Sequence, residues 1–156
     1  MADVPSLDSL AAIASKAGEA ILAVYRRADL GTAEKADGSP VTAADEAADA
    51  LISARLRDVF PDLALVTEEQ AETHAASADR FLIVDPLDGT KEFVQRRGDF
   101  TVNIALVENG VPVRGVVYAP ARERLFYTDA EGRSVEEAGP FDPDRPGTVT
   151  PISVRE

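Results

Sequence analysis

An alternating segment centred on Asn109-Gly110 places the strongest constraint on how this 156-residue chain can fold. Large apolar side chains alternate with smaller or polar residues on both sides of the dipeptide. They are Phe100, Val102, Ile104 and Leu106 before it, and Val111, Val113 and Val117, with Gly115 in phase, after it. Alternation with period two is typical of β-strands, and Asn-Gly favours the tight turn of a hairpin. The sequence therefore predicts an antiparallel β-hairpin.

Two amphipathic helices are predicted ahead of the hairpin. Between Ser6 and Arg27, apolar residues recur with the spacing of one helix face, at Leu10, Ala14, Ala17, Ile21 and Val24. A turn cluster at residues 37–40 precedes Thr42, and Asp45 three residues later completes a pattern that resembles a capping box. The second helix then carries an apolar face of Ala48, Leu51, Ile52, Leu56 and Val59, and stops before Pro61.

Shorter strands are predicted around this framework. They lie at residues 63–67, 81–84, 125–128, 133–137 and 149–154, while residues 70–79 are predicted to form an exposed loop or a frayed helix. The segment 139–147 is rich in Pro, Gly and Asp and is interpreted as a linker. We therefore expect an α+β fold, with two N-terminal helices packed on a mainly antiparallel sheet.

Charge and composition exclude several classes of function. With 16 basic against 28 acidic residues and a net charge of −12, the chain is not expected to bind nucleic acid. A small phosphorylated substrate would need divalent cations to neutralise so many carboxylates. The absence of cysteine and the single His74 exclude thiolate nucleophiles, zinc-thiolate sites and histidine triads. No transmembrane segment or signal peptide is evident, so a cytoplasmic protein is predicted.

An acidic motif follows the apolar run 81–84. Asp85 and Asp88 flank Pro86, and the predicted strand is expected to stop where the backbone turns. Pro86 fixes its own φ and removes a donor, which leaves both carboxylates and the Leu87 carbonyl free to converge as ligands of a hard cation. The alternative is an ordinary type I turn with Asp first and Pro second.

Residues beyond the motif favour phosphate chemistry. Gly89 permits a close backbone approach to a ligand, and a helix beginning near Asp88 would offer free N–H groups to an anion. Thr90 could pass a hydrogen bond from a water to a carboxylate such as Asp45. Two cations roughly 4 Å apart could clamp the attacking water and the leaving oxygen of a phosphoryl displacement.

Each further candidate has a plainer interpretation. Glu68 follows a predicted strand and could join the metal site, but Glu68-Glu69 could also be a solvated acidic pair. Asp45 could be only a helix-start acid. The pair Arg96-Arg97 could bind a substrate phosphate, although an exposed basic pair is commoner. His74 is interpreted as a solvated surface residue and is assigned no role.

Three motifs together resemble, in order and spacing, the inositol monophosphatase-like superfamily of magnesium-dependent, lithium-sensitive phosphatases. They are Gly38-Ser39-Pro40-Val41-Thr42-Ala43-Ala44-Asp45, Thr67-Glu68-Glu69 and Asp85-Pro86-Leu87-Asp88-Gly89-Thr90. The continuations Lys91-Glu92-Phe93 and Gly98-Asp99-Phe100-Thr101-Val102-Asn103-Ile104-Ala105-Leu106 are more similar to the bacterial 3'(2'),5'-bisphosphate nucleotidase branch.

The resemblance implies a role for each matching residue. Metal ligands would be Glu68, Asp85, the Leu87 carbonyl and Asp88, holding two or more Mg²⁺ ions in a complete enzyme. Asp45 and Thr90 match the pair that orients the attacking water. Substrate contacts would come from Glu68, Leu87, Asp88, Gly89 and Thr90, and Lys35 matches a lysine lying behind the ligands.

The implied substrate is 3'-phosphoadenosine 5'-phosphate, hydrolysed to AMP and phosphate in sulfate assimilation. The chain corresponds to about the first three-fifths of a typical family member and lacks the later Trp-Asp-x-Ala motif, so the resemblance implies an incomplete second metal site. Residues 1–138 would form the N-terminal metal-binding domain, and residues 139–156 a linker and the start of an absent C-terminal domain. The apolar surface exposed by such a truncation favours homodimerisation. The alternatives are an inositol monophosphatase and a non-catalytic metal- or ligand-binding truncated domain.

Overall fold

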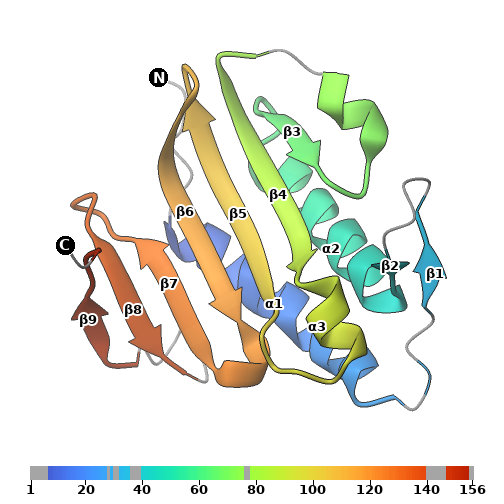
Figure 1. Ribbon diagram of the computed structural model, residues 1–156. Coiled ribbons are helices and arrows are strands. Elements are labelled where there is room, and N and C mark those ends of the chain that lie inside the picture. Colours follow the sequence, from blue (N-terminus) through green and yellow to red (C-terminus); the bar gives the residue numbers. More distant parts are fainter. Residues whose placement is uncertain are drawn as a thin grey trace.

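The computed structural model describes residues 7–27, 29, 32–35, 40–75, 78–139 and 147–154. Two long helices, α1 (Leu7–Tyr25) and α2 (Ala43–Val59), lie against one face of a seven-stranded sheet (Figure 1). The sheet is mainly antiparallel, because only β3 and β4 run parallel to each other. The predicted α+β architecture is confirmed.

The strands follow the chain in simple order across the sheet, β3-β4-β5-β6-β7-β8-β9. They are β3 (Ala64–Thr67), β4 (Arg80–Asp88), β5 (Thr101–Glu108), β6 (Val111–Ala119), β7 (Arg124–Thr128), β8 (Ser134–Ala138) and β9 (Val149–Pro151). A separate ribbon pairs β1 (Ala33–Glu34) with β2 (Pro40–Val41). Short helices α3 (Thr90–Val94), η1 (Ala71–Ala75) and η2 (Pro120–Arg122) complete the described elements.

The predicted capping box at the start of α2 is confirmed. The Thr42 side chain accepts a hydrogen bond from the Ala44 amide at 3.2 Å, and the Thr42 amide donates to Asp45 Oδ2 at 2.8 Å. These contacts satisfy amide groups that have no partner within the helix. At the other end, the Phe60 amide closes the last turn on the Leu56 carbonyl just before Pro61.

The predicted hairpin is β5–β6, and its turn has the expected backbone. Asn109 and Gly110 adopt φ values of 50° and 80°, the paired positive angles of a type I′ turn. The alternating residues of the second strand do not all lie on the buried face, since Val116 is buried and Val117 is 38% exposed. An irregularity in register opposite Leu106 and Val107 causes this, because one extra residue reverses which side chains face the helices.

Other boundaries differ modestly from those predicted. The last strand ends at Pro151 rather than at residue 154, and part of the segment 70–79 forms η1. Within the predicted turn cluster and linker, residues 37–39 and 140–146 lie outside the described residues. Strand β9 lies beyond the predicted division at residue 138 and pairs with β8 in the same sheet. The division itself stays a prediction.

In the part of the chain that is described, no helix combines the length and apolarity needed to cross a bilayer.

The core lies between the helices and the sheet. Tyr25 of α1 meets Phe93 and Phe100 in an aromatic cluster with ring centroids 5.0–5.3 Å apart. Phe93 and Phe100 are almost completely buried, and they belong to α3 and the approach to β5. This cluster therefore anchors the segment that follows the acidic motif to the first helix.

We expect Gly18→Ala to destabilise the protein, although glycine-to-alanine changes inside helices usually stabilise them by about 1 kcal/mol. A Cβ atom at Gly18 would lie 2.4 Å from Tyr118 Cε1 and 3.2 Å from Pro120 Cβ. Relieving this overlap between α1 and the sheet should cost about 1–3 kcal/mol. Urea denaturation of both proteins measures the difference, and a raised unfolding midpoint would contradict the close packing.

Candidate metal and phosphate site

The acidic motif lies at the end of β4, as predicted, but the strand does not stop at residue 84. β4 continues through Asp88 with an irregular register, because Asp85 pairs with Asn103 and Asp88 pairs with Thr101. Pro86 and Leu87 of β4 therefore lie opposite the single residue Val102 of β5, which is a β-bulge. Residues three apart on a regular strand point to opposite faces. The bulge brings both carboxylates to the same pocket.

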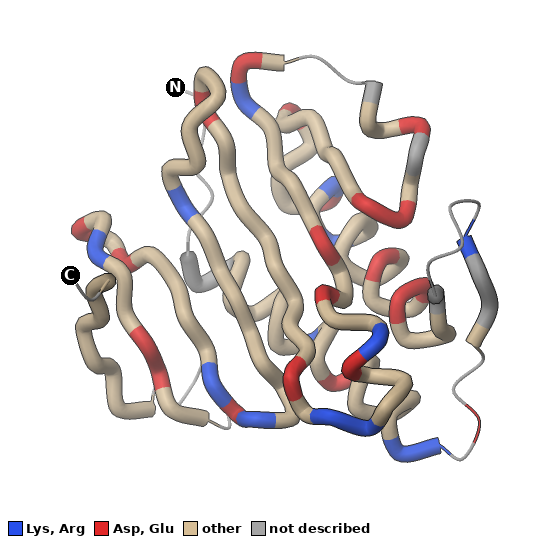
Figure 2. The backbone as a smooth tube through the Cα atoms, in the orientation of Figure 1, with Lys and Arg blue, Asp and Glu red and all other residues tan. Residues whose placement is uncertain are grey.

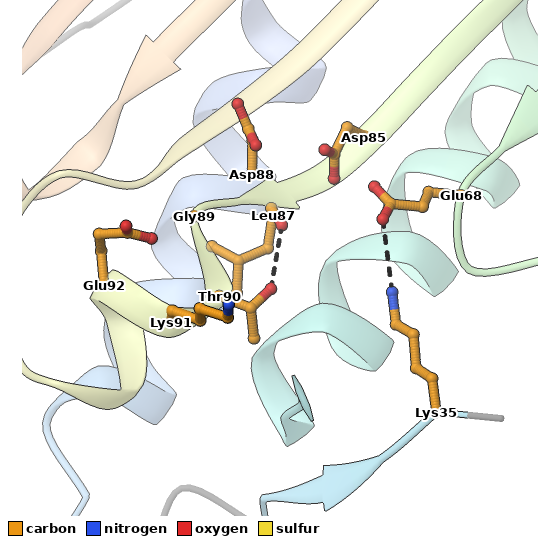
Figure 3. Close-up of a pocket in the computed structure, with 9 residues that line it drawn as sticks. All are labelled: Lys35, Glu68, Asp85, Leu87, Asp88, Gly89, Thr90, Lys91 and Glu92. Atoms are coloured by element: carbon orange, nitrogen blue, oxygen red, sulfur yellow. Dashed lines mark hydrogen bonds and ion pairs between the residues drawn. The ribbon is translucent and has the colours of Figure 1, made fainter. Parts of the chain in front are cut away.

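A pocket of about 230 Å³ opens at this end of the sheet. Figure 2 shows acidic positions gathered near the end of β4, on α3 and after β3. Among the described residues, the pocket is lined by Lys35, Glu68, Asp85, Leu87, Asp88, Gly89, Thr90, Lys91 and Glu92 (Figure 3). The structure thus brings together every predicted metal ligand, the predicted substrate contacts and Lys35.

Glu68 and Glu69 follow β3, and Lys35 lies against both of them. Its Nζ atom is 2.7 Å from Glu69 Oε1 and 3.5 Å from Glu68 Oε1. Burial lowers the pKa of Lys35, but the hydrogen bond and charge of Glu69, with the charges of Glu68 and Asp45, raise it overall. Glu69 is therefore held by the lysine, and the half-exposed Glu68 lies between Lys35 and Asp85 (Figure 3). The two glutamates do not form a simple solvated pair.

Asp85 is the most perturbed group in the pocket. Burial, a hydrogen bond with Glu68 and the negative charges of Glu68 and Asp88 raise the pKa of Asp85 to about 8. Its Oδ1 atom is buried and has no hydrogen-bond partner among the described residues. Buried polar atoms usually have partners, and crowded carboxylates resist simultaneous ionisation. A cation placed between these groups would satisfy both requirements.

The donor set fits a hard divalent cation. Glu68, Asp85 and Asp88 supply carboxylate oxygens and Leu87 supplies a backbone carbonyl, which are the ligands that Mg²⁺ prefers. In the described ranges, no three acidic or histidine side chains converge closely enough to form a complete metal-binding cluster on their own. The carboxylates instead surround the pocket, consistent with an ion that keeps several waters.

Asp45 lies behind the pocket and contacts it through Thr90. The Asp45 side chain is fully buried, and Oδ2 accepts hydrogen bonds from the Thr42 amide at 2.8 Å and from Thr42 Oγ1 at 2.7 Å. Thr90 Oγ1 donates to Asp45 Oδ1 at 2.9 Å, and it also lies 3.4 Å from the Leu87 carbonyl oxygen. The same aspartate therefore caps α2 and holds the hydroxyl that lines the pocket.

Some residues of the site were not assigned from the sequence. Lys91 and Glu92 line the pocket, and Asn103 Nδ2 donates to Asp88 Oδ2 at 3.3 Å. Lys91 and Glu92 directly follow the motif, so their proximity along the chain could have suggested them. Asn103 approaches only through the pairing of β5 with β4, and its position in the sequence carried no such signal.

Two other candidates lie elsewhere. The guanidinium of Arg96 donates to the backbone carbonyls of Tyr25 and Arg27, which ties α3 to the end of α1. Arg96 and Arg97 are not among the described residues that line the pocket. His74 is exposed, and its Nε2 atom lies 2.8 Å from the Thr67 carbonyl oxygen. Arg96 therefore forms hydrogen bonds that hold α3 against the end of α1. His74 gains no role in the pocket.

Two helices packed on a mainly antiparallel sheet match the inositol monophosphatase-like fold, and the carboxylates gather at the bulged end of β4. The chain belongs to the inositol monophosphatase family, whose model matches residues 5–152.

Several curated relatives are bisphosphate nucleotidases by name. The chain is 46% identical over 134 residues to 3'(2'),5'-bisphosphate nucleotidase CysQ of Escherichia coli O157:H7, which covers 84% of this chain and 54% of the relative. It is 47% identical, with the same coverage, to CysQ of Salmonella typhimurium. The chain therefore spans about half the length of the curated relatives it matches.

Solved structures agree with this assignment. CysQ from Bacteroides thetaiotaomicron is 40% identical, with a TM-score of 0.69, covering 85% of this chain and 48% of that one. An inositol monophosphatase from Thermotoga maritima is 31% identical, with a TM-score of 0.74, covering 83% and 50%. Both the family and the nucleotidase branch indicated by the motifs are supported.

Proposed function

We propose that this chain carries the metal- and phosphate-binding half of a Mg²⁺-dependent phosphomonoesterase of the 3'(2'),5'-bisphosphate nucleotidase type. The proposal rests on one observation: Glu68, Asp85, Asp88 and Leu87 line one pocket together with Thr90. The proposed reaction converts 3'-phosphoadenosine 5'-phosphate to AMP and phosphate, as a step in sulfate assimilation. The identity to nucleotidases named CysQ favours this substrate over inositol monophosphate.

The proposed ligands of the first cation are Glu68, Asp85 and the Leu87 carbonyl, and Asp88 with Asp85 would hold part of a second site. When bound, divalent cations supply a Lewis acid that neutralises phosphate charge and favours ionisation of the attacking water. Glu68, Leu87, Asp88, Gly89 and Thr90 would line the bound phosphate. Lys35 would lie behind the ligands, since its Nζ atom contacts Glu69 at 2.7 Å and the proposed ligand Glu68 at 3.5 Å.

The Thr90 hydroxyl and Asp45 are proposed to orient the attacking water. Because Thr90 Oγ1 donates its proton to Asp45 Oδ1, the lone pairs of the hydroxyl oxygen can accept a hydrogen bond from a water in the pocket. The two donors from Thr42 fix the second carboxylate oxygen and hold Asp45 in place. The proton lost by the water would pass toward this pair.

The proposal is tested by phosphate release from 3'-phosphoadenosine 5'-phosphate, with and without Mg²⁺ and with added Li⁺. We expect release that requires Mg²⁺ and is inhibited by Li⁺. Inositol monophosphate run in parallel separates the alternative substrate. Mg²⁺ binding by calorimetry without any release would favour the alternative of a non-catalytic metal-binding domain, and absence of both would overturn the proposal.

Thr90→Val should lower turnover by about 10²- to 10⁴-fold, the range associated with positioned proton transfer. Valine preserves the shape of threonine but cannot bridge a water to Asp45. Because no proposed metal contact is removed from the Thr90 side chain, Mg²⁺ affinity should remain close to that of the wild type. Single-turnover kinetics and calorimetry measure the two effects, and unchanged turnover would exclude the hydroxyl from the reaction.

The remaining features of the proposal concern the whole protein. We propose residues 1–138 as the N-terminal domain and 139–156 as a linker leading toward a further domain, which limited proteolysis of the native protein would test. A cytoplasmic location would be checked by cell fractionation. The proposed homodimer rests on apolar side chains on the sheet face away from the helices, where Ile83 is 42% exposed, and light scattering would test it.

A further inference from the structure

A buried polar network lies beside the turn that carries Glu68. Asp49 of α2 is 8% exposed, and its carboxylate accepts a hydrogen bond from Thr67 Oγ1 and another, at 2.9 Å, from Gln70 Nε2. Thr67 is fully buried at the end of β3. The turn is closed by the Gln70 amide, which donates to the Thr67 carbonyl at 3.2 Å. Asp49 therefore holds both ends of a four-residue turn.

Other side chains of α2 fix the amide of Gln70. Gln70 Nε2 also donates to Ser53 Oγ at 2.8 Å, and Ser53 is 3% exposed. Arg57 donates to Gln70 Oε1 at 3.0 Å. Both ends of the Gln70 amide group are thus engaged, which determines its orientation and directs its N–H groups at Asp49 and Ser53.

Glu68 lies inside this turn and faces away from the network into the pocket. Its amide donates to the Val84 carbonyl at 3.1 Å, one residue before Asp85. Asp49 is not among the described pocket-lining residues, and its hydrogen bonds reach the pocket through the turn that carries Glu68. Burying a carboxylate among neutral donors contributes little stability by itself. The Asp49 carboxylate instead supplies fixed hydrogen-bond acceptors for Thr67 and Gln70, the residues at the two ends of the turn that contains Glu68.

We propose that Asp49 is a positioning residue for the metal site: by holding Thr67 and Gln70, it fixes the Glu68 carboxylate beside Asp85. This inference rests on the proposed function, because it assigns Glu68 as a metal ligand. It identifies the contact through which α2 sets the geometry of a pocket that Asp49 does not touch. A ligand held in place before the cation arrives loses less conformational freedom on binding.

Asp49→Asn tests the inference. The asparagine retains an acceptor for Thr67, but it places an NH₂ group against the NH₂ of Gln70, which breaks one end of the turn. We expect Mg²⁺ affinity to fall about tenfold, the lower end of the effect of outer-shell partners on metal sites. Calorimetric Mg²⁺ titration well below the unfolding midpoint of each protein measures this loss. Asp58→Asn, an exposed change of equal charge on the same helix, should leave affinity unchanged.

A reciprocal variant separates positioning from a general loss of stability. Asp49→Asn combined with Gln70→Glu reverses the polarity of the contact, so the new asparagine NH₂ donates to the new carboxylate while the total charge matches the wild type. We expect Mg²⁺ affinity to return to within about twofold of the wild type, because two residues in direct contact couple strongly.

Hydrogen exchange in the absence of metal provides a second readout. The Glu68 and Gln70 amides should exchange faster in Asp49→Asn and recover in the double variant, since both belong to the turn that Asp49 holds. Unchanged Mg²⁺ affinity in Asp49→Asn would overturn the positioning role and leave the proposed function standing, as would loss of affinity that the double variant does not restore. Failure of the wild-type chain to bind Mg²⁺ would overturn both.

Discussion

Asp85→Asn is expected to abolish Mg²⁺ binding without unfolding the protein. Asp85 is the proposed ligand shared by both cation sites, and its buried Oδ1 has no other partner among the described residues. Losing a direct ligand should weaken binding by more than about 100-fold, because loss of an outer-shell partner already costs about 10- to 100-fold. Phosphate release, where the wild-type chain supports it, should disappear together with Mg²⁺ binding.

Thermal unfolding with and without Mg²⁺ checks this expectation. Without Mg²⁺, the unfolding midpoint of Asp85→Asn should not fall below that of the wild type, because asparagine, like the protonated Asp85 that its raised pKa favours, places no negative charge beside Glu68 and Asp88. In the wild type, Mg²⁺ at 100 times its dissociation constant should add about 2.7 kcal/mol to the free energy of unfolding, whereas the variant should gain none. Asp62→Asn, an exposed change of equal charge, is the matched control. Wild-type Mg²⁺ affinity in Asp85→Asn would remove Asp85 from the metal site.

Gly89→Ala should destabilise the fold and distort the pocket together. Gly89 precedes α3 with φ of 93°, a region that costs a residue with a Cβ atom about 1 kcal/mol or more. A Cβ here would also lie 2.8 Å from the Asp99 carbonyl oxygen and 3.3 Å from Phe100 Cα, which are backbone atoms that cannot rotate away. Overpacking adds about 1–3 kcal/mol, so a total loss of about 2–4 kcal/mol is expected.

Gly110→Ala separates the two causes of this loss. Gly110 has a similar φ of 80°, but no atom of the described residues lies within 4 Å of a Cβ built there. It should therefore cost only the conformational part, about 1 kcal/mol. Urea denaturation gives both values, and Mg²⁺ titration should show weakened binding for Gly89→Ala alone. Equal losses of stability in the two variants would refute the proposed clash between Gly89 and the segment at Asp99.

Much of the fold could be predicted because its determinants are local. The capping box needs only Thr42 and Asp45 three residues apart, and the hairpin turn needs only Asn109 and Gly110. Helical and alternating periodicities assigned the layers for the same reason. Alternation alone could not identify the buried face of β6, because one extra residue in a strand pair reverses the faces and leaves the composition unchanged.

By itself, the sequence determined which groups could bind a cation and phosphate: the spacing of Glu68, Asp85, Asp88 and Thr90, together with the resemblance, indicated the inositol monophosphatase family. Only the tertiary structure decided how they meet. The bulge at Pro86-Leu87 turns Asp85 and Asp88 to the same face, and the partners Asn103 and Asp49 come from strand pairing and helix packing. The physical reason is that the chemical type of each ligand depends on one residue alone. Which ligands lie around the same pocket depends instead on contacts between segments far apart in the chain.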